Sequence, residues 1–340
     1  MNQERSVNVK IRECKCCIND IQNESISIGH DGLCNICRDY QQHFDVKILK
    51  EELMFVKNFI SKDKYDCMIG LSGGKDSTAM LSPVLALGFH PLAFSFQIHY
   101  NNLTDSVREN IKFITQNLHV DYEVIDVCTY LNEIDRACFA GMADIYNKAS
   151  LNMISREEFR KIYFEGRKFY SVKENVIFPF VRPCQICRKI AIRAYYSEAV
   201  KRKINIVFIG INEWASNKNG RYSAIRRLKP LASAPEVFIV HLPYLLQRKY
   251  SEVIDILENT SCKEKVVETA VKTGGNSCSL ARACEDVAFD MLGFHLDSAR
   301  LAREVTVGFI DKDTARKAVN NGRYKSEKTV SEVLIDCNII

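Results

Sequence analysis

A glycine- and hydroxyl-rich segment, Ser72-Gly73-Gly74-Lys75-Asp76-Ser77-Thr78, is the part of the chain whose residue types most directly suggest chemistry. It follows an apolar run of strand length, Cys67 to Leu71, and precedes one of helical length, Ala79 to Leu87. The two glycines let backbone N–H groups approach an anion without a Cβ in the way, and a helix N-terminus adds partial positive charge. Three hydroxyl groups and one ammonium supply further donors. The segment therefore predicts a phosphate-binding turn, followed by a helix that Pro83 is expected to kink.

The Walker pattern is absent, and SGGKDS after a strand instead resembles the PP-loop of the adenine nucleotide alpha-hydrolase (ATP pyrophosphatase) superfamily. The resemblance implies an enzyme that binds ATP, releases pyrophosphate and leaves AMP on a carbonyl or amide oxygen of an acceptor. It implies that Mg²⁺ bridges the phosphates and that Lys75 and the loop N–H groups stabilise charge developing on pyrophosphate. Asp76 would help to hold Mg²⁺ or would cap the helix.

Two CxxC pairs about 16 residues apart stand near the N-terminus. The segment between them is too short to bury enough apolar surface to fold alone, and four thiolates around one Zn²⁺ would supply the missing stability. The expected ligands are Cys14, Cys17, Cys34 and Cys37. Cys16 is an alternative to Cys17, His30 is a further candidate ligand, and an iron–sulfur cluster is the rival to zinc.

A third CxxC, Cys184 with Cys187, begins a helix expected to run to about Lys201. The helix dipole and the neighbouring basic side chains are expected to lower the pKa of both thiols. The chain then continues into an apolar strand, Ile204 to Gly210, and Asn212, so Gly210 and Asn212 are expected at the nucleotide-binding edge.

This layout, PCxxCR, helix, strand and Gly-x-Asn, resembles the iron–sulfur tRNA thiolases of the same superfamily. The resemblance implies that Cys184, Cys187 and one distal cysteine hold a 4Fe-4S cluster whose open iron carries a sulfide. Cys278, in a glycine loop that opens a helix, is the preferred third ligand, and Cys262 and Cys284 are alternatives.

A second resemblance covers more of the chain. An N-terminal CxxC and DGxCxxC, then YDCxxGxSGGKDST, the central CxxC, a GGNxC loop and a late REVxxGFI segment resemble the N-acetyl sugar amidotransferases. That family implies amidation of a nucleotide sugar with ammonia from a partner glutaminase. Ammonia transfer requires no reactive cysteine pair, so the central CxxC favours sulfur transfer. A non-catalytic zinc protein that binds nucleic acid is a third hypothesis, against which the intact loop argues.

Alternating strands and helices, with strands also expected at Pro91 to Ile98 and Val120 to Val127, predict an α/β fold with a doubly wound parallel sheet, of the HUP/PP-loop type that the resemblance implies. The residues that follow the second strand, His99, Tyr100 and Asn101, are expected at its ligand-binding edge. The expected domains are a zinc-binding knuckle over 1–45, a catalytic domain over 46–245 with a solvated helical insertion over about 131–176, and a helical region over 246–340.

Smaller features complete this expected layout. Apolar residues at helical spacing predict one linker helix from about Tyr40 to Lys62. The basic segment Arg221 to Leu231 is expected to be a solvated loop or a phosphate contact. Asp311 is expected to cap the last helix.

Composition sets the remaining expectations. The 340 residues are 46% apolar and 26% charged with a formal charge of +5, which is typical of a globular protein and permits but does not indicate a polyanionic partner. No long apolar run or signal-peptide core is present, so a cytoplasmic protein without a membrane span is expected. Fourteen cysteines in that compartment favour metal or redox chemistry over disulfides. The expected partners are a small-molecule or nucleotide-sugar acceptor or tRNA, a sulfur donor or glutaminase subunit, and a second copy in a homodimer.

Overall fold

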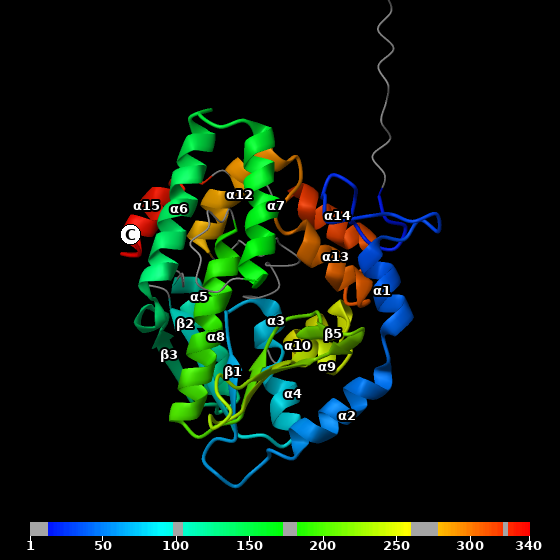
Figure 1. The fold of residues 1–340 in the computed structure, drawn as a ribbon. Helices are drawn as coiled ribbons and strands as arrows, with labels where there is room; N and C mark the ends of the chain where they lie inside the picture. The colour runs from blue at the N-terminus through cyan, green and yellow to red at the C-terminus, as the bar shows by residue number, and fades with distance from the viewer. Residues whose placement is uncertain (1–12, 98–104, 173–181, 260–277, 322–325) are drawn as a thin grey trace, which may run out of the picture.

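The centre of the structure, a computed structural model that describes residues 13–97, 105–172, 182–259, 278–321 and 326–340, is a six-stranded sheet (Figure 1). Its strand order is β3-β2-β1-β4-β8-β7, and all neighbours are parallel except β7, which is antiparallel to β8. The strands are β1 (Cys67–Gly70), β2 (Pro91–Gln97), β3 (Tyr122–Asp126), β4 (Ile206–Ile209), β7 (Ile225–Leu228) and β8 (Val237–His241). The chain leaves β1 toward β2 and β3 and returns on the other side at β4, so the switch point lies between β1 and β4. The predicted doubly wound sheet is confirmed.

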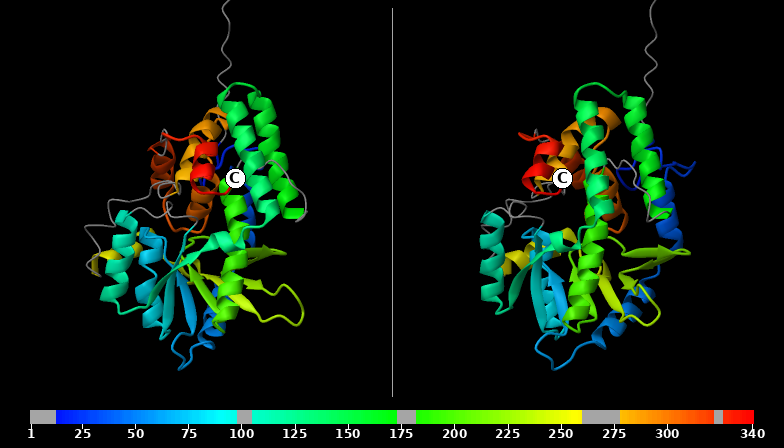
Figure 2. Two further views of the ribbon diagram at one scale, coloured as in Figure 1. Left: turned by 90° about the vertical axis from the view of Figure 1, so that its left-hand side faces the viewer. Right: turned by 60° about the vertical axis from the view of Figure 1, so that its left-hand side comes forward.

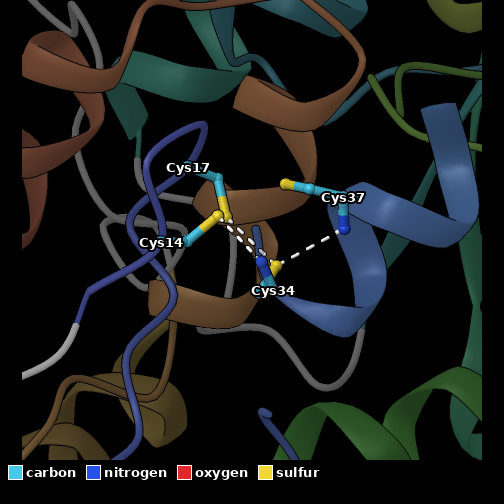
Figure 3. Close-up of side chains that lie close together, drawn as sticks. All are labelled: Cys14, Cys17, Cys34 and Cys37. Carbon is cyan, nitrogen blue, oxygen red and sulfur yellow. Dashed lines mark hydrogen bonds between the residues drawn. The ribbon is translucent and has the colours of Figure 1, made fainter. Parts of the chain in front are cut away.

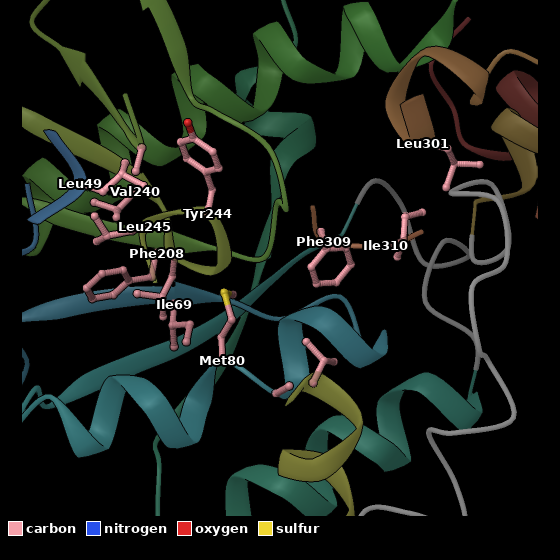
Figure 4. Packing of buried hydrophobic residues seen from close by; sticks show 14 of the residues in the cluster. Leu49, Ile69, Met80, Phe208, Val240, Tyr244, Leu245, Leu301, Phe309 and Ile310 are labelled. Carbon is pink, nitrogen blue, oxygen red and sulfur yellow. The ribbon is translucent and has the colours of Figure 1, made fainter. Parts of the chain in front are cut away.

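Side-chain alternation along the strands assigns the two faces of the sheet. Met68, Val207 and Ile239 face α8 (Pro183–Lys201) and form one core with it. Ile69 and Phe208 face the opposite way, into the core that α2 and α4 share with the C-terminal segment (Figure 4). The buried runs on both faces explain why the strands read as continuous apolar segments in the sequence.

The helix after the loop is divided, as Pro83 predicts. α3 (Lys75–Thr78) ends one turn before the proline, and α4 (Leu81–Ala86) begins two residues before it. Pro83 has no N–H to donate to the carbonyl of Ala79, and its ring crowds that carbonyl, so the break falls at Ala79 and Met80.

The prediction of a single linker helix was wrong. The expected linker helix is two helices, α1 (Asn35–His43) and α2 (Val46–Lys57). Phe44 is extended between them, and the Asp45 carboxylate accepts from the Lys47 N–H at 2.9 Å, which starts a new helix.

The basic segment expected as a solvated loop is instead β-structure. β5 (Ser216–Lys218) and β6 (Arg221–Ser223) form a hairpin, and β7 joins the main sheet. Asn219 and Gly220 turn the hairpin with φ of 53° and 79°, the geometry that Asn-Gly favours.

A helical layer covers one end of the sheet and has its own core (Figures 1 and 2). It consists of α6 (Glu133–Ser150), α7 (Arg156–Val172), α12 (Ser279–Leu292), α15 (Val330–Asp336) and the first half of α8. The predicted insertion therefore packs against the C-terminal helices instead of standing alone in solvent. The domain boundaries themselves stay a prediction.

The remaining helices complete the structure. They are α5 (Asp105–Asn117), η1 (Val127–Tyr130), α9 (Leu242–Leu245), α10 (Tyr250–Asn259), α13 (Ser298–Thr306) and α14 (Lys312–Asn321). Asp311 accepts from the Thr314 N–H at 2.7 Å and so caps α14, but α15 follows, so the prediction that this is the last helix was wrong. Within the described ranges, none of the helices has both the length and the apolar character that crossing a bilayer requires.

Candidate functional site

The predicted loop forms a closed turn between β1 and α3. Gly73 has a φ of 69°, which is strained for residues other than glycine. The Ser77 hydroxyl accepts from the Ser72 N–H at 3.0 Å and donates to the Gly74 carbonyl at 3.1 Å. This serine therefore holds the turn in shape, and the neighbouring Thr78 is buried.

Gly210, at the end of β4, lies against this turn. A Cβ on Gly210 would stand 3.0 Å from both the backbone N and the Cα of Ser77, which is tighter than nine in ten real Cβ contacts. The glycine therefore lets the end of β4 approach α3 closely, and Gly210 lies against the predicted loop.

A cavity of about 290 Å³ opens at this edge of the sheet. The loop and the end of β4 form one side, aromatic side chains of β2 and α8 form another, and a cysteine of the helical layer closes it. The lining residues are Gly70, Leu71, Ser72, Ser77, Phe94, Phe96, Tyr195, Ile209, Gly210, Ile211 and Cys278. The predicted nucleotide loop and the predicted third cysteine thus line one cavity. His99, Tyr100 and Asn101 lie outside the described residues.

Lys75 does not line the cavity in this structure. The residue is 9% exposed, and its Nζ lies 2.7 Å from both carboxylate oxygens of Asp76. The ammonium also lies 5.1 Å from the ring centroid of Tyr250 and 5.7 Å from that of Phe309. Gly74 is the N-cap of α3, so the prediction that Asp76 caps the helix was wrong, and its carboxylate instead holds the lysine.

Asn212 connects the site to α13, a contribution that the sequence analysis missed. Asn212 is 5% exposed, its Nδ2 lies 3.5 Å from Glu304 Oε1, and its Oδ1 has no hydrogen-bond partner among the described residues. Arg300 donates to Glu304 at 2.6 Å. Burial raises the pKa of Glu304, Arg300 opposes this rise and Asp76 adds to it, so these groups share one electrostatic environment. No spacing signal links residues about 90 positions apart.

The four N-terminal cysteines converge as predicted (Figure 3). Their sulfur atoms all lie within 4.8 Å of one another, and all four residues are buried. The group is Cys14, Cys17, Cys34 and Cys37, and no other set of metal-ligand side chains this close occurs in the part of the chain that the structure describes. Cys17 rather than Cys16 belongs to it, and His30 does not.

Backbone donors around these sulfurs favour thiolates. The Cys34 N–H donates to Cys14 Sγ at 3.2 Å, and the Cys37 N–H donates to Cys34 Sγ at 3.4 Å. Asn19 donates its N–H to Cys17 and its amide to Cys34, both at 3.5 Å. Four buried thiols with N–H donors fit a zinc ion or an iron–sulfur cluster.

The central cysteines lie at the N-termini of two helices of the helical layer. Cys184 and Cys187 begin α8, and Cys278 is the N-cap of α12. The prediction of low pKa values for these thiols was wrong. Burial raises the pKa of the Cys187 thiol well above its ordinary value, and the charges of Cys184 and Cys278 act in the same direction. Although Cys184 keeps an exposed face, the surrounding protein and Asp297 raise the pKa of its thiol to about 11.

The candidates for the third ligand differ in access. Cys278 lines the cavity, whereas Cys284 is fully buried in the core of the helical layer. The charge of Cys278 contributes to the raised pKa of Cys184, and the charge of Cys184 contributes to the raised pKa of Cys284. Cys262 and the glycine loop before Cys278 lie outside the described residues. No described cysteine forms a disulfide.

Comparison with known proteins does not assign this chain to a family. No family model matches the chain, and no curated protein matches it. Among solved structures, the U34-tRNA thiolase NcsA of Methanococcus maripaludis with its 4Fe-4S cluster is 16% identical, with a TM-score of 0.25 over 58% of this chain and 54% of the thiolase. This chain therefore spans about half of the thiolase's length.

Two synthetases match over more of their length. The NMN synthetase of Francisella tularensis is 12% identical, with a TM-score of 0.34 over 84% of this chain and 98% of that one. The NH3-dependent NAD synthetase of Campylobacter jejuni is 13% identical, with a TM-score of 0.31 over 83% and 98%. At these identities and TM-scores the matches carry no argument about the family, activity or substrate of this chain.

Proposed function

We propose that this chain is an ATP-dependent adenylating transferase of the ATP pyrophosphatase type. The observation that carries the proposal is the SGGKDS turn at the switch point, in contact with Gly210 and open to a cavity that also contains Cys278. In open α/β sheets a ligand binds at this position, beyond the carboxyl ends of the strands. Main-chain N–H groups next to a helix start are suited to a phosphate.

In the proposed reaction an acceptor carbonyl or amide oxygen attacks the α-phosphorus of ATP. The bond from that phosphorus to its β-bridging oxygen breaks, and pyrophosphate leaves with the electron pair. The loop N–H groups and the Ser72 hydroxyl would stabilise the leaving charge. Lys75 would contribute once its ammonium turns from Asp76 toward the phosphates, and the freed Asp76 carboxylate would then be available to Mg²⁺.

The proposed second half-reaction is sulfur transfer. Cys184, Cys187 and Cys278 would hold a 4Fe-4S cluster, which would supply a site for sulfide from an external sulfur donor. Two observations support this: the three thiols share one electrostatic environment, and Cys278 lines the cavity of the nucleotide loop. Sulfide would replace the AMP-bearing oxygen on the acceptor, and AMP would leave. A tRNA base or a small molecule is the acceptor under this proposal.

Amidation of a nucleotide sugar is the second candidate, and the raised pKa of the Cys184 and Cys187 thiols favours it. A neutral thiol is a poor cluster ligand, whereas amidation with ammonia from a glutaminase partner would need no thiol. In both cases the four N-terminal cysteines would hold a structural Zn²⁺ that stabilises the segment around them.

ATP–pyrophosphate exchange, measured against a panel of nucleotide sugars, tRNA and small acceptors, tests the adenylation proposal. Exchange that depends on an acceptor supports it, whereas ADP and orthophosphate as products would overturn it. Metal analysis after anaerobic purification distinguishes sulfur transfer from amidation. Brown protein with iron and sulfide supports sulfur transfer, and colourless protein with zinc alone that is active with ammonia supports amidation.

A further inference from the structure

Helix α13 contacts the four-cysteine centre through Thr306. The Thr306 Oγ1 lies 3.3 Å from Cys37 Sγ and 2.8 Å from the carbonyl of Ala302, one turn earlier in the same helix. A hydroxyl has one proton to donate. While Cys37 is a neutral thiol, that proton can stay on Ala302. A metal-bound thiolate is charged and is the stronger acceptor, so it would draw the proton to sulfur.

The segment that follows α13 contacts the other N-terminal cysteine pair, Cys14 and Cys17, through the backbone of Cys14. The Lys312 ammonium donates to the carbonyl of Cys14 and lies 2.8 Å from a carboxylate oxygen of Glu13. Arg316 pairs with the same carboxylate at 2.7 Å. Because α13 and α14 contact both cysteine pairs, the position of these helices depends on the geometry of the four-cysteine centre.

The opposite face of α13 points to the nucleotide loop. Glu304 accepts from Arg300 and from Asn212, and Arg303 pairs with Glu213 in the turn after β4. Phe309, just beyond the helix, places its ring over the Lys75 ammonium. One short helix therefore contacts the metal centre on one face and the turn beside Gly210 on the other.

We propose that Thr306 and Glu304 are positioning residues that couple metal occupancy of the four-cysteine centre to nucleotide affinity at the loop, with α13 as the rigid connection. The inference rests on the proposed binding of ATP. A helix with nine residues moves as a unit, since its backbone hydrogen bonds are internal. A change at Thr306 therefore displaces Glu304, and with it the Asn212 side chain, which follows the cavity-lining residues Gly210 and Ile211.

The chain contains its own reporter for this coupling. Trp214 is the single tryptophan in the sequence, two residues after Asn212. Its ring centroid lies 5.5 Å from that of Tyr40 in α1 and 4.9 Å from that of Tyr222 in the hairpin. Its fluorescence should therefore respond when α1, which begins next to Cys34, moves relative to the turn after β4.

Thr306→Val in the 340-residue, zinc-loaded chain is the test, with Thr115→Val as its matched control. Thr115, like Thr306, donates to the carbonyl four residues earlier, here at 2.9 Å, but it lies in α5 and has no contact with a thiol in the described structure. Losing the Thr306 hydroxyl should weaken ATP binding by roughly three- to tenfold, the equivalent of one ordinary hydrogen bond, with zinc content unchanged. Thr306→Ser keeps the hydroxyl and should restore the affinity.

Three measurements decide the outcome: ATP affinity by calorimetry, zinc per chain, and Trp214 emission with and without a zinc chelator. Support consists of weaker ATP binding in T306V and in Glu304→Gln, normal binding in T115V, and a chelator-dependent emission change that T306V reduces. If the wild-type chain binds ATP and T306V binds it equally well, the coupling is wrong. If the wild-type chain does not bind ATP, the proposed function itself fails, and this inference fails with it.

Discussion

Gly210 at the end of β4 and Ser77 at the start of α3 are in backbone contact, so that even one added methyl group between them would stand 3.0 Å from Ser77 N and Cα. Ser77 is also the residue whose hydroxyl shapes the loop, through bonds to Ser72 and Gly74. The contact therefore makes the geometry of the anion-binding turn depend on a strand that lies more than a hundred residues away in the chain.

Gly210→Ala should weaken ATP binding and lower the stability of the nucleotide-free chain, because Ser77 must move to accept the Cβ. The expected loss of unfolding free energy is about 1–3 kcal/mol. Gly74→Ala is the control for stability: its φ is −82°, and its Cβ would meet only Ser72 Oγ at 3.5 Å. That variant should fold normally and lose only nucleotide affinity. Equal stability of both variants in urea titration would show that the contact does not hold the loop.

Asp76→Asn should destabilise the chain, because the buried Lys75 ammonium would lose its carboxylate partner. Asp76 is about a quarter exposed, so the expected loss is about 1–3 kcal/mol, below that of a fully buried pair. The double variant Lys75→Met with Asp76→Asn should regain most of this stability, since no charge remains unpaired. Neither variant should release pyrophosphate. Lys75→Ala should also abolish release, and retained release in that variant would remove the lysine from its assigned role.

Cys34→Ser should abolish metal binding at the N-terminal centre, because Cys34 is one of four sulfurs that lie within 4.8 Å of one another. Wild-type protein should contain one metal equivalent more than this variant, and chelation should lower its melting temperature. Cys16→Ser is the matched control, since Cys16 lies outside the four-sulfur group. Plasma emission spectroscopy measures the metal content of each protein. Loss of the metal in Cys16→Ser, or its retention in Cys34→Ser, would contradict the assignment of these ligands.

His241 should make the chain less stable in acid. Burial and the neighbouring Arg188 and Arg226 lower the pKa of His241 from 6.5 to about 3, and its Nδ1 lies 2.7 Å from the Glu213 carbonyl. Because the unfolded chain takes up this proton near pH 6.5 and the folded chain does not until about pH 3, the stabilisation is complete above pH 6.5 and is lost as the pH falls toward 3.

The measurement compares wild type with His241→Asn, which keeps an N–H donor but has no group that titrates in this range. Unfolding free energies from urea titration at pH 7.5 and pH 5.0 should fall by about 2 kcal/mol more in wild type, since each pH unit contributes at most about 1.4 kcal/mol per proton. Equal slopes in the two proteins would mean that His241 is not held neutral in the folded chain.

The sequence by itself determined the features that depend on neighbouring residues. The strand–SGGKDS–helix arrangement, the break one turn before Pro83 and the two N-terminal CxxC pairs follow from local backbone sterics and ligand spacing. The hairpin at Asn219 and Gly220 also depends on neighbouring residues, because an Asn-Gly dipeptide favours a hairpin turn. The sequence analysis interpreted this segment by its basic residues and did not use the dipeptide.

Only the tertiary structure decided the features that depend on distant residues. The pKa of Cys184 was expected to be low from its helix and its basic neighbours, but burial and the charge of Asp297 raise it, and neither is visible in a linear pattern. The contribution of Glu304 to the site likewise requires α13 to pack between the cysteine centre and β4. Desolvation and long-range packing depend on which segments meet in space, and that is the physical reason why spacing along the chain could not predict them.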